Sequence, residues 1–221
     1  MKEVLIVLPA GIGDVIYCQK IAKTLANKGF DVCWPLKDSI TYISDYIDFS
    51  GLNKHPTTSD YITLNLRDCH YQFPEHPIMS VKYKYCGIDD SDWKDYVKLN
   101  RNQKKEKELY QKLCADYNEY VVVNNLFGTP PNHVRHDIPK PTAKNIVYMD
   151  VVEGYSVFDW SMILENAKEI YTIDTSLNYI IDLLDVKATK LDCYSRFKPS
   201  NFFHIKGLWK KNWNYKLWEN I

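Results

Sequence analysis

The fold of this chain is decided near its start, by the stretch Val4-Leu5-Ile6-Val7-Leu8-Pro9-Ala10-Gly11-Ile12-Gly13-Asp14-Val15-Ile16-Tyr17. The apolar run at its beginning predicts a buried strand, and residues 13–25 predict a helix whose apolar face is formed by Val15, Cys18, Ile21, Ala22 and Leu25. The glycines between them mark a strand-to-helix turn at the carboxyl end of a strand. Open α/β sheets bind their ligands at such ends, so this turn predicts a site with Asp14 as the first candidate for chemistry.

Composition narrows the class of protein. The chain has 221 residues, with 28 lysines and arginines against 28 aspartates and glutamates, so its formal net charge is zero. A protein that binds duplex nucleic acid usually carries a basic excess, and this balance argues against one. No apolar run approaches the roughly 20 residues that span a bilayer. The six cysteines form no C-x-x-C pair, and we expect reduced thiols in a cytoplasmic protein with no membrane segment.

Strands and helices are predicted to alternate along the first half of the chain. We expect strands over 30–35, 60–66 and 77–85, and helices over 38–46 and 89–113. The last of these contains a charged run at 101–108, which is typical of a solvated helix face or a connector between domains.

The pattern restarts at Tyr120, where a second buried strand over 120–124 leads into a long loop. The elements expected after that loop are strands over 145–149, 169–173 and 188–193, and helices over 158–167 and 174–184. Near the end, tryptophans and a leucine spaced four apart predict a helix over 208–218, which must pack on another part of the molecule. Alternating strands and helices indicate parallel sheets. We therefore expect an α/β fold with two domains that face a cleft.

The glycine turn is a poor dinucleotide fingerprint, because Ile16 stands where the third glycine is needed and no acid ends the second predicted strand. Asp14 is instead a candidate general base that accepts a proton from a substrate hydroxyl. The alternative is a purely structural role, in which the Asp14 carboxylate only caps the helix by accepting hydrogen bonds from the free N–H groups at the helix start. The turn alone does not separate these two hypotheses.

A second candidate site lies where the strand over 169–173 ends and a helix begins. Free N–H groups at a helix start bind phosphate, and hydroxyl side chains add donors. The candidate residues are Asp174, Thr175, Ser176 and Asn178. An ordinary helix cap explains the same residues without any ligand.

The loops after two other strands add further candidates. Asn125, Gly128, Thr129 and Arg135 could present backbone and cationic donors to an anion. Glu153 could bind ribose hydroxyls, although a polar loop that caps the next helix is the simpler interpretation. Two nearby histidines three residues apart do not suffice for a metal site.

Together these pieces resemble a glycosyltransferase of the GT-B class, and in particular the ADP-heptose:lipopolysaccharide heptosyltransferase family. That family opens with a strand, a short glycine turn and Gly-Asp before a helix, and this chain has Gly11-Ile12-Gly13-Asp14 in that place. Near the end of its second domain the family has a strand that ends in Asp-Ser-Gly before a helix. The corresponding stretch here is Ile173-Asp174-Thr175-Ser176.

The resemblance implies two compact Rossmann-like domains, one over 1–116 for the acceptor and one over 117–205 for a nucleotide-sugar. A final helix over 206–221 would pack back on the first domain. The resemblance further implies an inverting transfer that needs no metal and no cofactor. Asp14 would deprotonate a hydroxyl of a glycan or another acceptor held near Gly11, Ile12 and Gly13. The leaving diphosphate would bind at Thr175, Ser176 and Arg135. An inactive nucleotide-sugar or glycan-binding module of the same fold is the alternative, and an epimerase is a weaker one.

Overall fold

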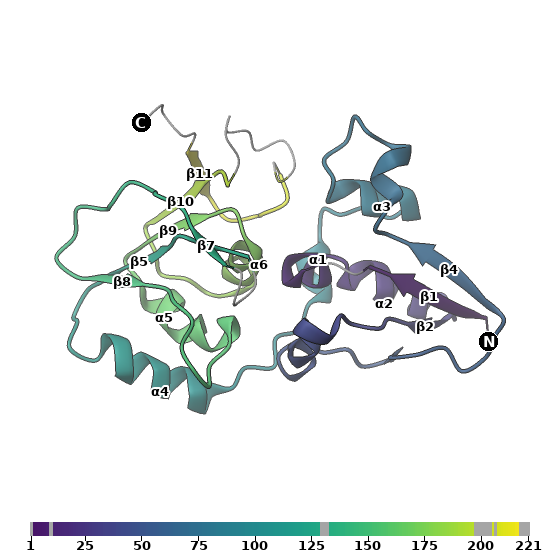
Figure 1. Ribbon diagram of the computed structural model, residues 1–221, viewed down its shortest axis with the longest axis horizontal. Coiled ribbons are helices and arrows are strands. Elements are labelled where there is room, and N and C mark those ends of the chain that lie inside the picture. The colour runs from purple at the N-terminus through teal and green to yellow at the C-terminus, as the bar shows by residue number, and fades with distance from the viewer. Residues whose placement is uncertain (1, 9–10, 129–132, 197–204, 206, 217–221) are drawn as a thin grey trace. The chain divides into compact units, whose positions relative to one another are not determined.

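The structure is a computed structural model that describes residues 2–8, 11–128, 133–196, 205 and 207–216 (Figure 1). It divides the chain into two compact units. The first contains the described residues up to Asn100 together with Ile205, Gly207 and Leu208, and the second contains the other described residues from Arg101 onward. The boundary lies at 100/101 and not at the expected 116/117, because the helix before residue 116 packs on elements of the second unit.

The first unit is built on a four-stranded parallel sheet with the strand order β3-β2-β1-β4. Its strands are β1 (Glu3–Val7), β2 (Asp31–Cys33), β3 (Leu52–Asn53) and β4 (Tyr61–Asn65). β1 lies between β2 and β4, and its side chains are buried or half-buried on both faces. Its apolar sequence is what a strand inside a parallel sheet requires.

Helices of the first unit follow its strands. The helix predicted over 13–25 is present as two helices, α1 (Ile12–Tyr17) and α2 (Gln19–Asn27). The helix predicted over 38–46 is the 3-10 helix η1 (Asp38–Asp45), and two further 3-10 helices are η2 (Cys69–Gln72) and η3 (Trp93–Tyr96). The helix predicted over 89–113 is therefore wrong in its first part. The long helix begins only after Asn102, whose side chain caps it.

The strand predicted over 77–85 is wrong, because Ser80–Cys86 form helix α3. The Val81 N–H bonds to the carbonyl of Pro77 at the start, and Gly87 ends the helix with a left-handed φ of +63°. A proline before and a glycine after a short segment are helix boundaries, and here they override the alternation of apolar residues that favours a strand. The helical turn carries Lys82 inward.

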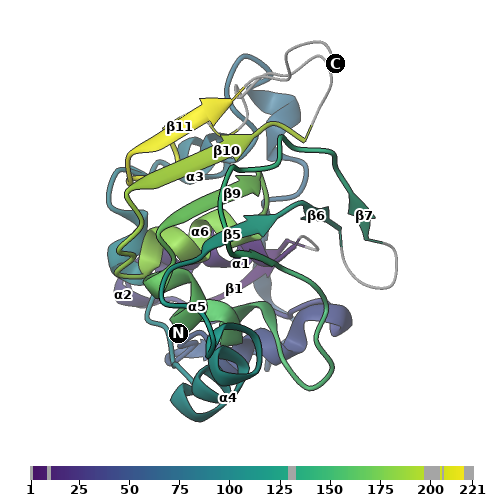
Figure 2. The same cartoon turned by 90° about the vertical axis from the view of Figure 1, so that its left-hand side faces the viewer.

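The second unit is built on a five-stranded parallel sheet with the order β11-β10-β9-β5-β8, and Figure 2 shows β11, β10, β9 and β5 side by side in that order. Its strands are β5 (Val121–Asn124), β8 (Ile146–Tyr148), β9 (Glu169–Ile173), β10 (Lys190–Tyr194) and β11 (Trp213–Lys216). A short antiparallel pair, β6 (Leu126–Phe127) and β7 (Val134–Arg135), follows β5. The α/β fold with parallel sheets is thus confirmed.

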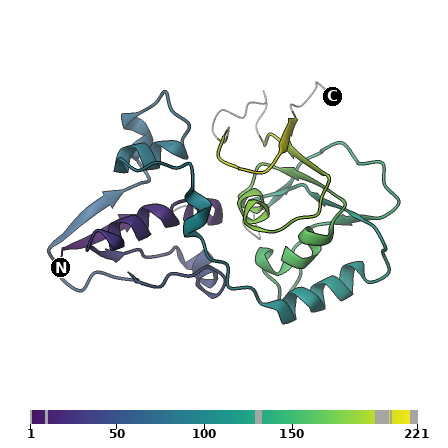
Figure 3. The same ribbon diagram turned by 180° about the vertical axis from the view of Figure 1, so that it is seen from behind.

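Helices of the second unit are α4 (Gln103–Cys114), the 3-10 helix η4 (Val157–Trp160), α5 (Ser161–Asn166) and α6 (Ser176–Leu183). α4 packs against α5 and η4 (Figure 3). Most of the charged run at 101–108 is exposed, as expected for a solvated face. Glu106 is the exception, since it is buried and paired with Arg101.

The helix predicted over 208–218 is also wrong. Trp213–Lys216 form strand β11, which extends the second sheet beside β10. Buried Trp213 and half-buried Tyr215 alternate with exposed Asn214 and Lys216, and this period of two belongs to a strand. Leu208, at the start of this segment, belongs to the first unit, where its carbonyl accepts a hydrogen bond of 2.8 Å from Trp93.

Two general properties follow from the described residues. Within them, no helix has the length and apolar character needed to cross a membrane. All six cysteines are free thiols.

Candidate functional site

The strand order of the first sheet places Asp14 where a ligand is expected. In a sheet of order β3-β2-β1-β4, the chain runs from β1 through β2 to β3 on one side and then returns to place β4 on the other side of β1. The strand order reverses between β1 and β4, so the crevice for a ligand lies beyond the carboxyl ends of these two strands. Helix α1 begins shortly after β1, and Asp14 is in its first turn. Sequence and topology therefore indicate the same edge of the sheet.

The Asp14 carboxylate is held by an ion pair and does not cap the helix. The N-cap of α1 is Gly11, and no side-chain cap hydrogen bond is present there. Asp14 Oδ1 lies 2.8 Å from the ammonium of Lys82, whose side chain is 6 % exposed, whereas that of Asp14 is 26 % exposed. Burial by itself lowers the pKa of Lys82, but the nearby Asp14 carboxylate, together with the Cys18 and Cys69 side chains, outweighs this effect and the pKa is raised. Lys82 is thus a buried cation, and its partner Asp14 is partly open to solvent.

The turn before Asp14 goes from exposed to buried along three residues. Gly11 is exposed, Ile12 is half-buried and Gly13 is buried. A Cβ added at Gly11 would meet open space, and its φ of −83° suits any residue. The backbone is therefore exposed at Gly11 and becomes buried by Gly13.

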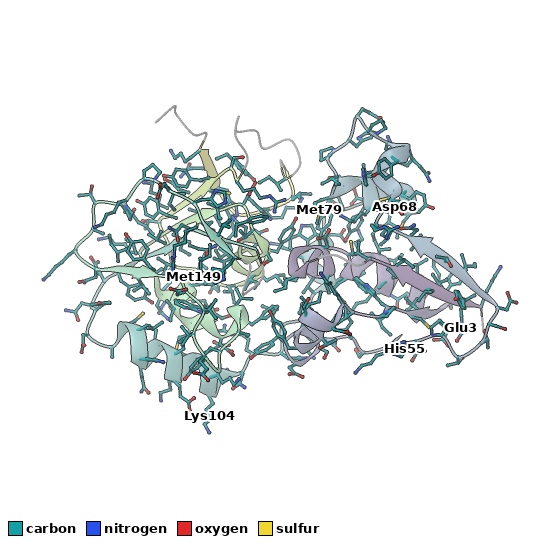
Figure 4. All side chains as sticks on the ribbon, in the orientation of Figure 1. Glu3, His55, Asp68, Met79, Lys104 and Met149 are labelled. Atoms are coloured by element: carbon teal, nitrogen blue, oxygen red, sulfur yellow. The ribbon has the colours of Figure 1, made fainter. Side chains whose placement is uncertain are left out.

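The carboxyl end of β4 adds a polar cluster that sequence reasoning missed. Val7 of β1 pairs in register with Asn65 of β4, so the two strand ends lie side by side. Asp68 (labelled in Figure 4) accepts two hydrogen bonds of 2.8 Å from Arg67 and one of 2.9 Å from Asn65. These bonds, that from Arg67 above all, lower the pKa of Asp68 to about 2. Such side chains suit sugar hydroxyl groups, and they follow a strand that the sequence did predict.

The second sheet has its own crevice. Its order β8-β5-β9-β10-β11 places the switch point beyond the carboxyl ends of β5 and β9. Asn124 ends β5, and its amide donates to Thr172 Oγ1 at 3.1 Å and to Thr175 Oγ1 at 3.4 Å. The candidate phosphate segment after β9 therefore lies at this switch point. Asn124 was not among the predicted site residues.

The start of α6 is a capping box. Thr175 Oγ1 accepts from the Leu177 N–H at 3.3 Å, and Asn178 Oδ1 accepts from the Thr175 N–H at 3.1 Å. Asn178 is fully buried and also donates to the Cys193 thiol, so it supports the helix and does not face a ligand. Thr175 and Ser176 are half-buried. The cap interpretation is confirmed for Thr175 and Asn178, and a half-buried helix start remains for an anion.

Asp174 lies beside a cation that the sequence analysis did not single out. Its side chain is fully buried, and Oδ1 accepts from the Arg196 N–H at 3.1 Å. Arg196 Nε lies 3.5 Å from Asp174 Oδ1, and the Arg196 side chain is 28 % exposed. The guanidinium carbon lies 5.0 Å from the centroid of the Phe127 ring. Arg196 follows β10 by two residues. Its place after a predicted strand is the signal that could have found it.

The loop after β5 forms a second polar group. Arg135 donates to Asn125 Oδ1 at 3.1 Å and to Asp150 Oδ2 at 2.5 Å, and nearly half of its side chain is exposed. Gly128 has a φ of +100°, a conformation that favours glycine. The predicted residue Thr129 lies outside the described residues. Glu153 is exposed in the loop before η4.

Over the described part of the chain, no group of three or more histidine, cysteine, aspartate or glutamate side chains could hold a metal ion.

Comparisons with known proteins bear on the fold. No family model matches the sequence, and no curated protein matches it. Among solved structures, the chain is similar to a glycosyl transferase family 9 protein from Veillonella parvula, with a TM-score of 0.55, 8 % identity, and coverage of 97 % of this chain and 86 % of that one. It is also similar to TibC, an iron-containing dodecameric glycosyltransferase from E. coli, with a TM-score of 0.52, 8 % identity, and coverage of 88 % and 58 %.

A third solved structure is ADP-heptose LPS heptosyltransferase II from E. coli, with a TM-score of 0.48, 9 % identity, and coverage of 98 % and 90 %. The two similarities with TM-scores above 0.5 show that this chain shares the fold of those glycosyltransferase structures. The resemblance stated from the sequence is confirmed at the level of the fold.

Proposed function

We propose that this protein is a glycosyltransferase that moves a sugar from a nucleotide-sugar to a hydroxyl group of a glycan or another acceptor. The observation that carries the proposal is the Asp14 carboxylate, which lies at the ligand-binding edge of a parallel sheet and is partly open to solvent. The two solved structures described above that share this fold are both named as glycosyltransferases. This supports an enzyme that transfers sugars over the alternative of an inactive binding module.

The proposed reaction inverts the sugar carbon in one displacement. Asp14 accepts the proton of the acceptor hydroxyl while the acceptor oxygen forms a bond to the anomeric carbon. The bond between that carbon and the phosphate oxygen breaks, and the nucleoside diphosphate leaves with the electron pair. The reaction is therefore balanced: Asp14 takes the proton, the acceptor oxygen gains the bond, and the diphosphate takes the electron pair of the broken bond.

We assign donor binding to the second unit. The N-terminus of α6 at Thr175 and Ser176 supplies N–H groups for a phosphate, and Arg196 supplies a guanidinium beside the same strand ends. Phe127 offers an aromatic face, and Arg135 lies on the loop after β5. Glu153 is the proposed ribose ligand. Fixed dipoles and cations of this kind can stabilise the leaving group without a metal or cofactor.

We assign acceptor binding to the first unit, at the turn of Gly11, Ile12 and Gly13 and at the polar cluster of Arg67 and Asp68. The finer architecture that the resemblance implies, two Rossmann-like domains facing a cleft, belongs to this proposal. It gives each substrate its own sheet edge.

The proposal is tested by thermal shift with a panel of nucleoside diphosphates and nucleotide-sugars. A ligand that binds only the folded state raises its melting temperature, by an amount set by concentration over Kd. We expect a selective rise with one nucleotide class and, with that donor, transfer to a hydroxyl acceptor. No rise with any nucleotide would contradict the proposal.

Arg196→Ala should reduce the nucleotide-dependent rise, because it removes the proposed phosphate cation. Lys168→Ala is the matched control. Lys168 precedes β9 at the opposite edge of the same sheet, where it forms an exposed pair with Glu119. Equal loss in both variants would refute the location of the donor site.

A further inference from the structure

Lys82 has more contacts than a surface lysine. Its ammonium lies 2.8 Å from Asp14 Oδ1, 3.1 Å from Met79 Sδ and 3.5 Å from the Ile78 carbonyl. An ammonium has three N–H donors, and three acceptors converge on it here. The side chain is therefore held in one place, and Asp14 is the only charged group among these three acceptors.

The ion pair joins two elements that are distant in sequence. Asp14 is in the first turn of α1, and Lys82 is on α3 after Met79 (labelled in Figure 4). The far end of α1 is tied to the same helix, since the Tyr83 hydroxyl donates to the Tyr17 carbonyl at 2.5 Å. α3 thus contacts both ends of α1, once through a charge pair and once through a neutral hydrogen bond.

The Lys82 ammonium is buried and therefore needs a partner of opposite charge. The residue Lys82 is 5 % exposed, and a buried ammonium is stable only when an opposite charge compensates it. A neutral side chain could pack α3 on α1 at lower cost, so the charge requires another explanation. The carboxylate that it fixes is the one proposed to take the acceptor proton.

We propose that Lys82 is the positioning residue for the Asp14 base. This inference rests on the proposed function. Lys82 holds Oδ1 and thereby fixes the plane of the carboxylate, while the second oxygen accepts the proton of the acceptor hydroxyl. Lys82 keeps its own protons throughout and does not touch either substrate.

The test is a kinetic double-mutant cycle on the transfer reaction, with Asp14→Asn, Lys82→Met and the two combined. We expect Lys82→Met to lower kcat on the order of 100-fold, the loss typical of a misplaced catalytic group, with the donor KM nearly unchanged. Lys82→Arg retains a cation and should recover part of the rate. In the Asp14→Asn background, Lys82→Met should cause no further loss, because its effect passes through Asp14.

Tyr83→Phe is the matched control, because it removes the other bond between α3 and α1 and leaves the charge pair intact. It should retain a kcat within a few-fold of the wild type. If the wild type transfers sugar and Lys82→Met has the same kcat, the positioning role is overturned while the proposed function stands. Equal losses in Lys82→Met and Tyr83→Phe also overturn it, since they indicate only helix packing. Absence of transfer by the wild type with every donor overturns both this inference and the proposed function.

Discussion

The ion-pair network of Arg101 gives the sharpest prediction about stability. Arg101 Nε bonds to both carboxylate oxygens of Glu106 at 2.9 and 3.2 Å, and Nη2 bonds to the same carboxylate. Nη1 bonds to Glu165 at 2.6 Å. The side chain of Glu106 is 1 % exposed, against 29 % for Arg101 and 20 % for Glu165. Glu106 is on α4 and Glu165 is on α5, so the network connects these two helices.

The effects of three substitutions should rank by the charge that each leaves behind. Arg101→Met leaves the Glu106 carboxylate buried without its partner, and breaking such a pair costs about 3–5 kcal/mol. We expect about 3 kcal/mol, because Arg101 is partly solvated. Glu165→Gln leaves Arg101 with Glu106 and should cost about 0.5–1 kcal/mol. Glu106→Gln should lie between them, since Arg101 keeps Glu165.

The assay is urea unfolding followed by circular dichroism. With slopes of about 1–3 kcal/mol per molar urea, Arg101→Met should move the midpoint down by about 1 M or more. Lys168→Met, which breaks an exposed pair, is the control, and its shift of the urea midpoint should be no more than about a third of the shift for Arg101→Met. A shift for Glu165→Gln as large as that for Arg101→Met would refute the ranking by burial.

Three further predictions concern titration, reactivity and the last strand. Hydrogen bonds from Thr57 and Thr58 hold the pKa of Glu3 at about 2. They stabilise the fold fully above the ordinary carboxyl pKa and progressively less as the pH falls toward 2. Urea midpoints should therefore show that a Thr57→Val, Thr58→Val variant differs most from the wild type at pH 7 and least near pH 2. Burial raises the pKa of Cys86 to about 12, so iodoacetamide at pH 8 should label native protein slowly and denatured protein fast, as mass spectrometry can measure. Asp182 accepts two backbone N–H groups before β11, and Asp182→Asn should speed hydrogen exchange in that strand while β9 stays protected.

Local patterns predicted the strands whose ends carry the candidate site residues. The apolar runs at 4–8 and 120–124 are buried strands, and the residues after them were expected at strand ends. Asp14 and Thr175 could be found because a strand, a turn and a helix are adjacent in sequence. Their neighbourhood was predictable since the carboxyl ends of parallel strands share one edge.

Partners distant in sequence could not be predicted in the same way. The pairing of Asp14 with Lys82 depends on how α3 packs on α1, and alternation over 77–85 favoured a strand that would turn Lys82 outward. β11 was mistaken for a helix because tryptophans at a spacing of four fit a helical stripe. The edge of β10 and the Asp182 carboxylate, both remote in sequence, select the strand.

The most direct test of the central claim measures transfer and nucleotide binding together in wild type and Asp14→Asn. With the donor class found by thermal shift, the account predicts equal nucleotide affinity in both proteins. It predicts that transfer by Asp14→Asn falls at least about 100-fold, the usual contribution of a general base. Because Asp14→Asn leaves Lys82 without its carboxylate, the Asp14→Asn, Lys82→Met protein should be measured beside it as a folded reference. Transfer at the wild-type rate by a folded Asp14→Asn protein would contradict the account.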